Sequence, residues 1–247
     1  MTAHAETFPR VSLPRLTGIE LRKMADTRAG FWLLLVIQLL AAAIVAITVI
    51  AGEAKDQNFH DLFKGALWVV SILLPVLGIL SVTSEWSQRT SLTTFALVPE
   101  RGRVIAAKML ATTGLTIYAL AACLLTAAIG NVFAGGSWDM PLYAVGHGAL
   151  FELLGVLGGV AFGLVFLRSA LAIVLYFVLP MAWTVLGETI HALDEPADWL
   201  DTSRTMMPLV DGGMTGTAWA RLGTSMALWL GAFLVVGLIR LRRVELK

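Results

Sequence analysis

The chain has 247 residues, of which 57% are hydrophobic and only 14% are charged, whereas soluble domains carry about 25% charged residues. A soluble globule of this size cannot bury so much apolar surface, so the composition excludes a water-soluble enzyme fold and indicates an integral membrane protein. The net charge of +1 indicates no nucleic-acid partner, and the single cysteine, Cys123, excludes an intrachain disulfide and a cysteine-based metal site. We expect residues 1–247 to form a single transmembrane domain.

The first predicted element is an amphipathic helix over residues 15–28 that lies on the inner surface of the membrane. Thr17-Gly-Ile-Glu20 has the form of a capping box that opens a helix, and Pro14 is expected to stop any helix before it. On a helical wheel, Glu20 intrudes on an apolar side that otherwise carries Leu13, Leu16, Leu21 and Met24. We expect the chain to turn into the bilayer at Ala29-Gly30. The alternative is a basic tail that lies in the cytosol.

Six apolar runs are long enough to form transmembrane helices. A helix needs about 20 apolar residues to cross roughly 30 Å of hydrocarbon, because each backbone polar group must be bonded within the segment. The predicted spans are Phe31–Ile50, Gly65–Val82, Met109–Phe133, Met140–Leu167, Ser169–Gly187 and Leu222–Ile239. The sequence therefore predicts an all-α polytopic membrane protein with six transmembrane helices.

The positive charges predict the direction of the spans. Fourteen of the 18 Lys and Arg residues lie before span 1, between spans 2 and 3, between spans 4 and 5, or after span 6. The opposite side has only Lys55, Lys64, Arg204 and Arg221, together with nine acidic residues. Because connections rich in Lys and Arg stay in the cytoplasm, both termini are predicted to be cytoplasmic.

The connection over 84–103 is too polar to span the membrane, yet it has a helical pattern. Leu92, Phe95 and Ala96 fall at i, i+3 and i+4, and Pro99 followed by Gly102 ends the pattern. A short helix with an apolar stripe is predicted at the cytoplasmic surface. Either the bilayer or a cytoplasmic partner protein could cover that stripe.

The longest segment on the other side covers residues 189–221. It is acidic and is interrupted by Pro196, Pro208 and Gly212-Gly213. The apolar pairs Trp199-Leu200 and Met206-Met207 predict short helices that rest on the outer face of the membrane or dip into it.

Glu152 is the one acid well inside a predicted span. A charged carboxylate at that depth costs on the order of 2.5–3.5 kcal/mol, and such residues usually face a bundle interior or water. One interpretation is that Glu152 lines a pathway or binds a cationic group. The other is that it lies near the outer interface, or is protonated and bonded to a neighbouring helix.

The same span carries Gly155, Gly159 and Gly163 at intervals of four residues. Small residues in such a row let two helix backbones approach closely in lipid. The pattern predicts that this helix packs tightly against another, in the same chain or in a second copy.

The sequence lacks three common catalytic and nucleotide-binding motifs. It has no G-x-x-x-x-G-K-[ST] phosphate loop, no H-E-x-x-H zinc motif and no G-x-S-x-G nucleophile turn. We therefore expect no enzymatic activity and no cofactor in this chain itself.

Several motifs of the chain resemble those of the permease subunits of ABC-2 type transporters, in the short form common in actinobacteria. That family has S-E-aromatic, a polar turn, T-x-x-T, and then P-x-R-x-x-x-x-A-K leading into the third span. The matching residues here are Ser84-Glu85-Trp86, Thr90, Thr93-Thr94, Pro99, Arg101 and Ala106-Ala107-Lys108. Glu20-Leu21-Arg22-Lys23 and the stretch from Gly159 to Glu188 are also similar to the family.

The resemblance implies that the chain is a subunit of an exporter in a bacterial plasma membrane. A separate ATPase subunit, which carries the ATP and Mg²⁺, would grip the helix in the 84–103 loop. Because one six-helix unit normally provides half of the pathway, a second permease chain, identical or related, is implied. The docking residues implied by the resemblance are Glu85, Arg89, Leu92, Phe95, Ala96, Glu100 and Arg101.

Two functions of other classes remain open at this point. One is an intramembrane hydrolase that uses Glu152 and His147, and the other is a pore or scaffold that needs no energy source. Activity of the purified chain without ATP would favour the hydrolase. A neighbouring gene for an ATPase would favour the exporter.

Overall fold

The computed structural model describes residues 11–52, 58–88, 90, 94 and 100–243. Over these residues the protein is helical, and no strand is present apart from an isolated backbone bridge between Asn58 and Ser137. The prediction of an all-α protein is thus confirmed for this part of the chain.

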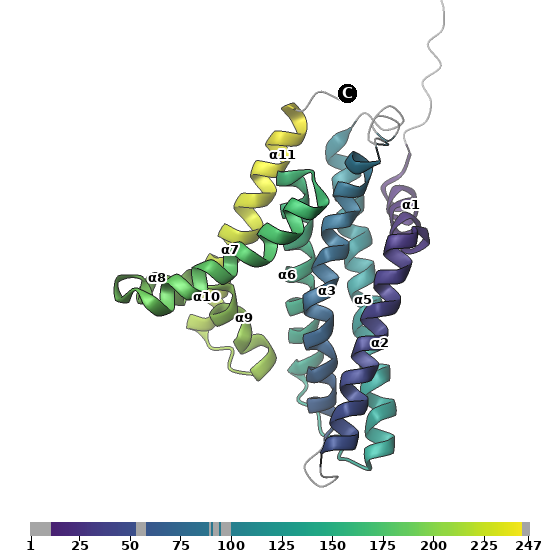
Figure 1. Ribbon diagram of the computed structural model, residues 1–247, viewed down its shortest axis with the longest axis vertical. Helices are drawn as coiled ribbons and strands as arrows, with labels where there is room; N and C mark the ends of the chain where they lie inside the picture. Colours follow the sequence, from purple (N-terminus) through teal and green to yellow (C-terminus); the bar gives the residue numbers. More distant parts are fainter. Residues whose placement is uncertain (1–10, 53–57, 89, 91–93, 95–99, 244–247) are drawn as a thin grey trace, which may run out of the picture.

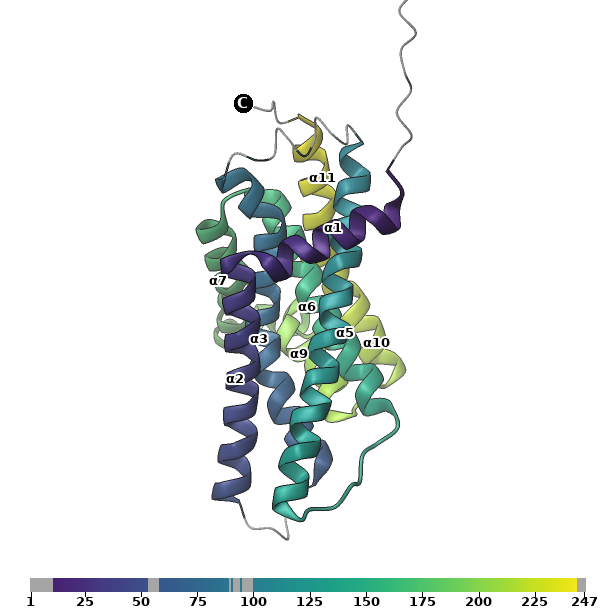
Figure 2. The ribbon, with the colours of Figure 1, turned by 90° about the vertical axis from the view of Figure 1, so that its right-hand side faces the viewer.

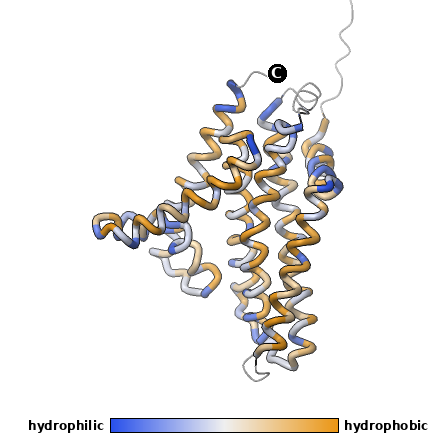
Figure 3. The backbone as a smooth tube through the Cα atoms, in the orientation of Figure 1, coloured by the Kyte–Doolittle hydropathy of each residue, from blue (hydrophilic) through white to orange (hydrophobic). Residues whose placement is uncertain are grey.

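Within the residues that the structure describes, six helical segments are long and apolar enough to cross a membrane, as predicted. The first five are α2 (Arg28–Ala51), α3 (Phe59–Ser87), α5 (Arg101–Ala134), α6 (Tyr143–Phe166) and α7 (Ser169–Thr189). The sixth consists of α10 (Gly216–Met226), the π-helical turn η2 (Ala227–Ala232) and α11 (Phe233–Arg243). Hydrophobic residues follow these segments, and hydrophilic residues gather towards their ends (Figure 3).

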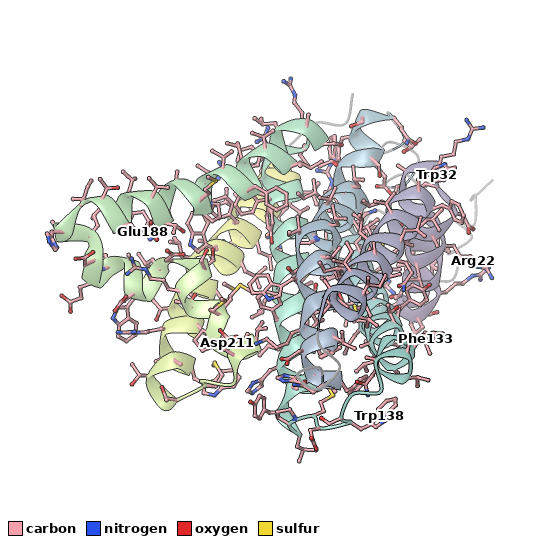
Figure 4. All side chains as sticks on the ribbon, turned by 60° about the horizontal axis from the view of Figure 1, so that its bottom comes forward. Arg22, Trp32, Phe133, Trp138, Glu188 and Asp211 are labelled. Carbon is pink, nitrogen blue, oxygen red and sulfur yellow. The ribbon has the colours of Figure 1, made fainter. Side chains whose placement is uncertain are left out.

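The spans form two groups. Helices α2, α3, α5 and α6 run alongside one another, whereas α7 and the sixth segment lean away from them (Figure 1). The core of the first group draws on all four helices and includes Ile37, Val45, Leu67, Val70, Cys123 and Val156. Exposed tryptophans lie near both ends of this group, with Trp32 close to the start of α2 and Trp138 beyond the end of α5 (Figure 4). This arrangement is typical of membrane interfaces.

The segment between the fifth and sixth spans folds into short helices. A 3₁₀ turn, η1 (His191–Leu193), leads into α8 (Asp194–Leu200) and then α9 (Thr202–Asp211). Leu209 and Val210 of α9 pack with Phe151 of α6 and Leu222 of α10. Helix α9 therefore packs between α6 of the first group and α10 of the sixth span.

Helix α1 (Leu13–Asp26) lies across one end of the first group, in front of α3 and α5 in Figure 2. Its buried residues, Leu16, Glu20 and Met24, recur at intervals of four and form one face, and Arg22 points away from the bundle (Figure 4). The spacing is that of an amphipathic helix. The acid in the middle of this face is explained below.

The predicted start of α1 is wrong. The helix begins at Leu13, with Ser12 at its N-cap position, so the Thr17-Gly-Ile-Glu20 segment is not a capping box. The Thr17 hydroxyl instead donates to the Leu13 carbonyl within the helix at 3.0 Å. Pro14 lies in the first turn, where a residue without an N–H is tolerated because no carbonyl precedes it in the helix.

A sharp turn at Thr27 connects α1 to α2. The Thr27 side chain caps α2 by accepting a hydrogen bond from the Gly30 N–H at 3.2 Å. A Cβ added to Gly30 would lie only 1.7 Å from the Met24 carbonyl oxygen, so the two helices meet where only glycine fits.

We expect Gly30→Ala to destabilise the fold by about 1–2 kcal/mol, because the Cβ forces the end of α1 away from α2. The matched control is Gly18→Ala in α1, where an added Cβ meets no atom within 4 Å. That control should be neutral, or stabilising by up to about 1 kcal/mol from helix propensity. Unfolding in mixed SDS and detergent micelles, followed by tryptophan fluorescence, measures both. Equal stability of the two variants would show that the turn is not constrained.

Candidate functional site

A buried lysine is the centre of a charged cluster at the end of the bundle where α1 lies. Lys108 of α5 is only 2% exposed. Its Nζ atom donates to Glu20 Oε2 at 2.6 Å, to Glu85 Oε1 at 3.0 Å and to the Ser81 carbonyl at 2.8 Å. An ammonium group has three donors. All three are therefore used inside the protein.

Lys23 of α1 completes the cluster from its outer side. Its Nζ atom contacts Glu20 Oε1 at 2.7 Å and Glu85 Oε1 at 3.0 Å, and its side chain is 42% exposed. Partial burial lowers the pKa of Lys23, but the hydrogen bond to Glu20 and the charge of Glu85 outweigh burial and raise the pKa above its ordinary value of 10.5. Lys23 therefore stays charged at neutral pH. Its stabilising effect is lost only as the pH rises above 10.5 and through the raised pKa.

The cluster of Glu20, Lys23, Glu85 and Lys108 joins three helices. Glu20 and Lys23 come from α1, Glu85 lies two residues before the end of α3, and Lys108 lies in the second turn of α5. Buried charges need partners on every side, so each helix is fixed in position by the other two. The cluster thus ties α1 to the two helix ends that flank the connection between α3 and α5.

The cluster accounts for one expected docking residue. Glu85 is 7% exposed and its carboxylate is occupied by two lysines, so in this structure it holds α3 to its neighbours and does not face outward. Glu100 is exposed and accepts from Arg103 at 3.4 Å. Arg101 donates from its guanidinium to the Leu241 carbonyl, which links the start of α5 to α11. Arg89, Leu92, Phe95 and Ala96 lie outside the described residues.

Sequence reasoning missed the ion pairs of Lys108, although two signals pointed to them. Glu20 was out of place on the apolar side of the α1 wheel, and Lys108 adjoins a long apolar run. Lys108 was counted with the positive charges of the connection, whereas the structure places it inside α5. An acid on an apolar face together with a lysine beside an apolar run indicates a buried ion pair.

Glu152 lies in the interior of the bundle. It is 1% exposed, and neither of its carboxylate oxygens has a hydrogen-bond partner in the described part of the chain. It lies one turn from Gly148 and one turn from Val156, and both of these contact α3. The side chain is therefore on the α3-facing side of α6, among apolar residues. Burial shows that Glu152 faces the interior of the bundle, and within the described residues no hydrogen bond joins it to a neighbouring helix. Its depth in the membrane stays a prediction.

We expect Glu152→Leu to stabilise the fold by about 1–2 kcal/mol, since it removes a buried polar group that has no partner. If Glu152 has no role in transport, the variant should change stability alone. If Glu152 serves a pathway, the same variant should lose transport or ligand binding while its unfolding midpoint rises. A fall in stability on unfolding in SDS and detergent would contradict this prediction and would show that the carboxyl group has an internal partner.

The three glycines of α6 all face α3, but they approach it to different extents. A Cβ on Gly159 would lie 2.2 Å from the Pro75 carbonyl oxygen, and one on Gly163 would lie 3.0 Å from the Ile79 carbonyl oxygen, both in α3. At Gly155 the nearest atom would be Pro75 Cγ at 3.5 Å, which is ordinary contact. The tight partner of α6 is therefore α3 of the same chain, and the two glycines nearer the α1 end make the closest approach.

A second cluster of charges holds α8, α9 and α10 together. Asp201 is fully buried and accepts from the Ser203 N–H at 2.7 Å and from the Thr184 hydroxyl at 3.0 Å. Asp198 pairs with Arg204 and with Arg221, each at 3.0 Å. These contacts explain why an acidic segment folds onto the end of α7. Sequence reasoning had assigned these charges to the outer side without pairing them.

The residues of the hydrolase alternative are not arranged as a metal site. The His147 ring packs against Tyr143 and, edge-on, against Trp219, with ring centroids 5.0 and 5.9 Å away. Among the described residues, no group of three or more His, Cys, Asp and Glu side chains could hold a metal ion.

Comparison with known proteins gives no further guidance on the function: no protein-family model matches the chain, and no curated protein matches it.

Proposed function

We propose that this chain is the membrane-spanning subunit of an ATP-binding cassette exporter, coupled to a separate ATPase subunit. The observation that carries the proposal is the Lys108 cluster, which fixes α1 to the ends of α3 and α5 on either side of their connection. The resemblance of the 84–108 segment to ABC-2 permeases supports the same role. ATP and Mg²⁺ would be bound by the partner, and this chain would carry out no chemistry.

The geometry suits the transmission of a mechanical movement. A partner that pulls on the α3–α5 connection pulls on two spans directly, and the cluster passes the same displacement to α1 and then to α2 through the tight turn at Gly30. The close contact between α3 and α6 carries it further into the bundle. Packed elements with fixed contacts move as units, so one grip on the connection can move four spans together.

Each six-helix chain would form half of the pathway, beside a second permease chain that is identical or related. The proposed orientation places both termini, α1 and the α3–α5 connection in the cytoplasm of a bacterial cell, because the Lys and Arg residues concentrate there. Under this proposal α8 and α9 lie on the outer side. Glu152 is the candidate pathway residue, since it is an enclosed acid without a partner.

Cysteine labelling in intact cells tests the orientation. Native Cys123 is 1% exposed and should not react with a membrane-impermeant maleimide, so single cysteines can be added to the natural chain. We expect Trp138→Cys to be labelled from outside, whereas Arg22→Cys should be labelled only after the membrane is opened. Labelling of Arg22→Cys in intact cells would overturn both the orientation and the proposed docking.

Co-purification with a candidate ATPase subunit from the same organism tests the function itself. We expect the wild-type chain to retain that ATPase and Phe95→Asp to lose it, while insertion and yield stay normal. Phe95 is chosen from the sequence pattern alone, since it lies outside the described residues. The matched control is Trp138→Asp at the opposite end of the bundle, which should keep the complex. A complex that survives Phe95→Asp would refute docking through this stripe, and transport that continues without any ATPase would favour the pore.

A further inference from the structure

A groove of about 1010 Å³ lies beside the Lys108 cluster. Its walls come from α1, the first turn of α2, the second half of α3 and the start of α5, and Thr90 and Thr94 of the connection between α3 and α5 also line it. The volume is at the upper end of the range for ligand pockets, about 300–1,000 Å³. The proposed coupling uses only the charged residues at one end of this space.

The groove is amphipathic along its length. One part is apolar: Ile19 is exposed and Leu80 is half-buried, while Met24 and Leu77 line its floor and are themselves buried. From Leu77 to Glu85, α3 rises by about 12 Å at 1.5 Å per residue. Over that distance the lining changes from leucine to the charged cluster. The groove therefore offers a long apolar wall with charge at one end.

The charged end of the groove has one more cationic than anionic side chain. Glu20 and Glu85 are balanced by Lys108 and Lys23 in direct contacts. Arg28 also lines the groove, is exposed, and makes no ion pair with any residue that the structure describes. A ligand with a single negative charge would match this excess, whereas a neutral or cationic head group would not.

The position of the groove relative to the membrane defines the ligand further. Arg28 begins the membrane-spanning helix α2, so it lies at the edge of the hydrocarbon layer, while Leu77 and Leu80 lie inside the membrane-spanning helix α3. The apolar part is thus level with lipid tails, and the cation is level with lipid head groups. A soluble anion would leave the apolar wall uncovered.

We propose that this groove binds one anionic phospholipid from the adjoining leaflet. Its phosphate group pairs with Arg28 and faces Lys23, and one acyl chain lies along Ile19 and Leu80. The lipid would fill the space between α1 and α3 and hold α1 in its place across the bundle. The site requires no ATPase and no second chain, so it stands independently of the proposed function.

Lipid binding to the purified chain tests the proposal. The chain in mild detergent is titrated separately with phosphatidylglycerol, phosphatidylcholine and inorganic phosphate, and the unfolding temperature and the native mass spectrum are recorded. We expect one phosphatidylglycerol to remain bound per chain and to raise the unfolding temperature as its concentration increases. Phosphatidylcholine should give a much smaller shift, and inorganic phosphate should give none.

Two pairs of variants test the two ends of the groove. Arg28→Gln should weaken phosphatidylglycerol binding by about tenfold, whereas Arg22→Gln, on the outward side of α1, should leave it unchanged. Leu80→Trp should block the acyl chain, whereas Leu110→Trp, at an exposed position of α5 outside the groove, should not.

The opposite results would overturn the proposal. Equal shifts of the unfolding temperature with phosphatidylglycerol and phosphatidylcholine would show that the groove does not select for negative charge. A full shift with inorganic phosphate would indicate a site for soluble anions. If Leu80→Trp leaves lipid binding unchanged, the groove is not where the lipid binds. None of these measurements requires the ATPase, so they can fail while the proposed function holds, and the converse is equally true.

Discussion

Replacing Lys108 with methionine is expected to destabilise the folded protein by about 3–5 kcal/mol, the cost typical of removing one partner from a buried ion pair. The side chain is 2% exposed and holds Glu20 at 2.6 Å and Glu85 at 3.0 Å. Without it, two buried carboxylates share the single half-exposed ammonium of Lys23. We expect α1 to detach from the bundle before the spans separate, because α1 is held by this cluster and a short apolar face.

Unfolding in mixed SDS and detergent micelles measures this effect, and limited proteolysis of α1 reports its detachment. The matched control is Lys64→Met, which breaks the ion pair with Asp211. In that pair the Lys64 side chain is 27% exposed and the Asp211 side chain is 50% exposed. Exposed pairs contribute at most about 1 kcal/mol. If Lys108→Met were no more harmful than Lys64→Met, the cluster would not be the main link between α1 and the bundle.

A double-mutant cycle separates the ion pair from the effects of each residue alone. Adding Glu20→Gln to Lys108→Met removes one of the uncompensated charges and leaves the Lys23–Glu85 pair in place. We expect the double variant to lose less unfolding free energy than the two single variants lose together, with a coupling energy of about 1–3 kcal/mol. Strict additivity would show that Glu20 and Lys108 do not interact in the membrane.

Replacing Gly159 with alanine is expected to destabilise the bundle by about 2–3 kcal/mol, because a single methyl group forces α3 and α6 apart. The added Cβ would lie 2.2 Å from the Pro75 carbonyl oxygen, 3.0 Å from its carbonyl carbon and 3.2 Å from its Cα. All three are backbone atoms, so no side chain can rotate to make room. The contact is reciprocal, since a Cβ on Gly78 of α3 would lie 2.3 Å from the Val156 carbonyl oxygen of α6.

Gly155 provides the matched control, one turn away on the same helix. A Cβ there would meet Pro75 Cγ at 3.5 Å and the Tyr176 hydroxyl at 3.8 Å, both ordinary contacts. We expect Gly155→Ala to be neutral, or to stabilise the protein by up to about 1 kcal/mol through helix propensity. The unfolding midpoints of the two variants in SDS and detergent should therefore move in different directions. A shared loss would mean that both glycines pack on a second chain as well.

The number and order of the spans could be predicted because hydrocarbon imposes its own length on a helix. Their ends could not be predicted so well. α5 begins at Arg101, eight residues before the expected Met109, and α3 begins at Phe59, six residues before Gly65. Counting apolar residues stops at the first charged residue, whereas helical hydrogen bonds continue past the hydrocarbon for as long as side chains and neighbours support them.

The candidate site was harder to predict than the spans because its members are far apart in the sequence. Glu20, Glu85 and Lys108 come from three helices, and each has an ordinary local explanation as a surface charge. Only the packing of α1 across α3 and α5 turns them into one buried cluster (Figure 2). The G-x-x-x-G pattern indicated that α6 packs tightly against another helix, but it could not identify that helix. The pattern is a property of α6 alone.

The separation of Glu20 from Lys108 by 88 residues affects how the protein is made. At translation rates of about 5–20 residues per second, the acid leaves the ribosome on the order of ten seconds before the lysine that neutralises it. During that interval the first amphipathic segment has to wait on the membrane surface with its charge in water. It can take its final place only after the third crossing has delivered the matching ammonium, so α1 docks later than the two spans that follow it in the sequence.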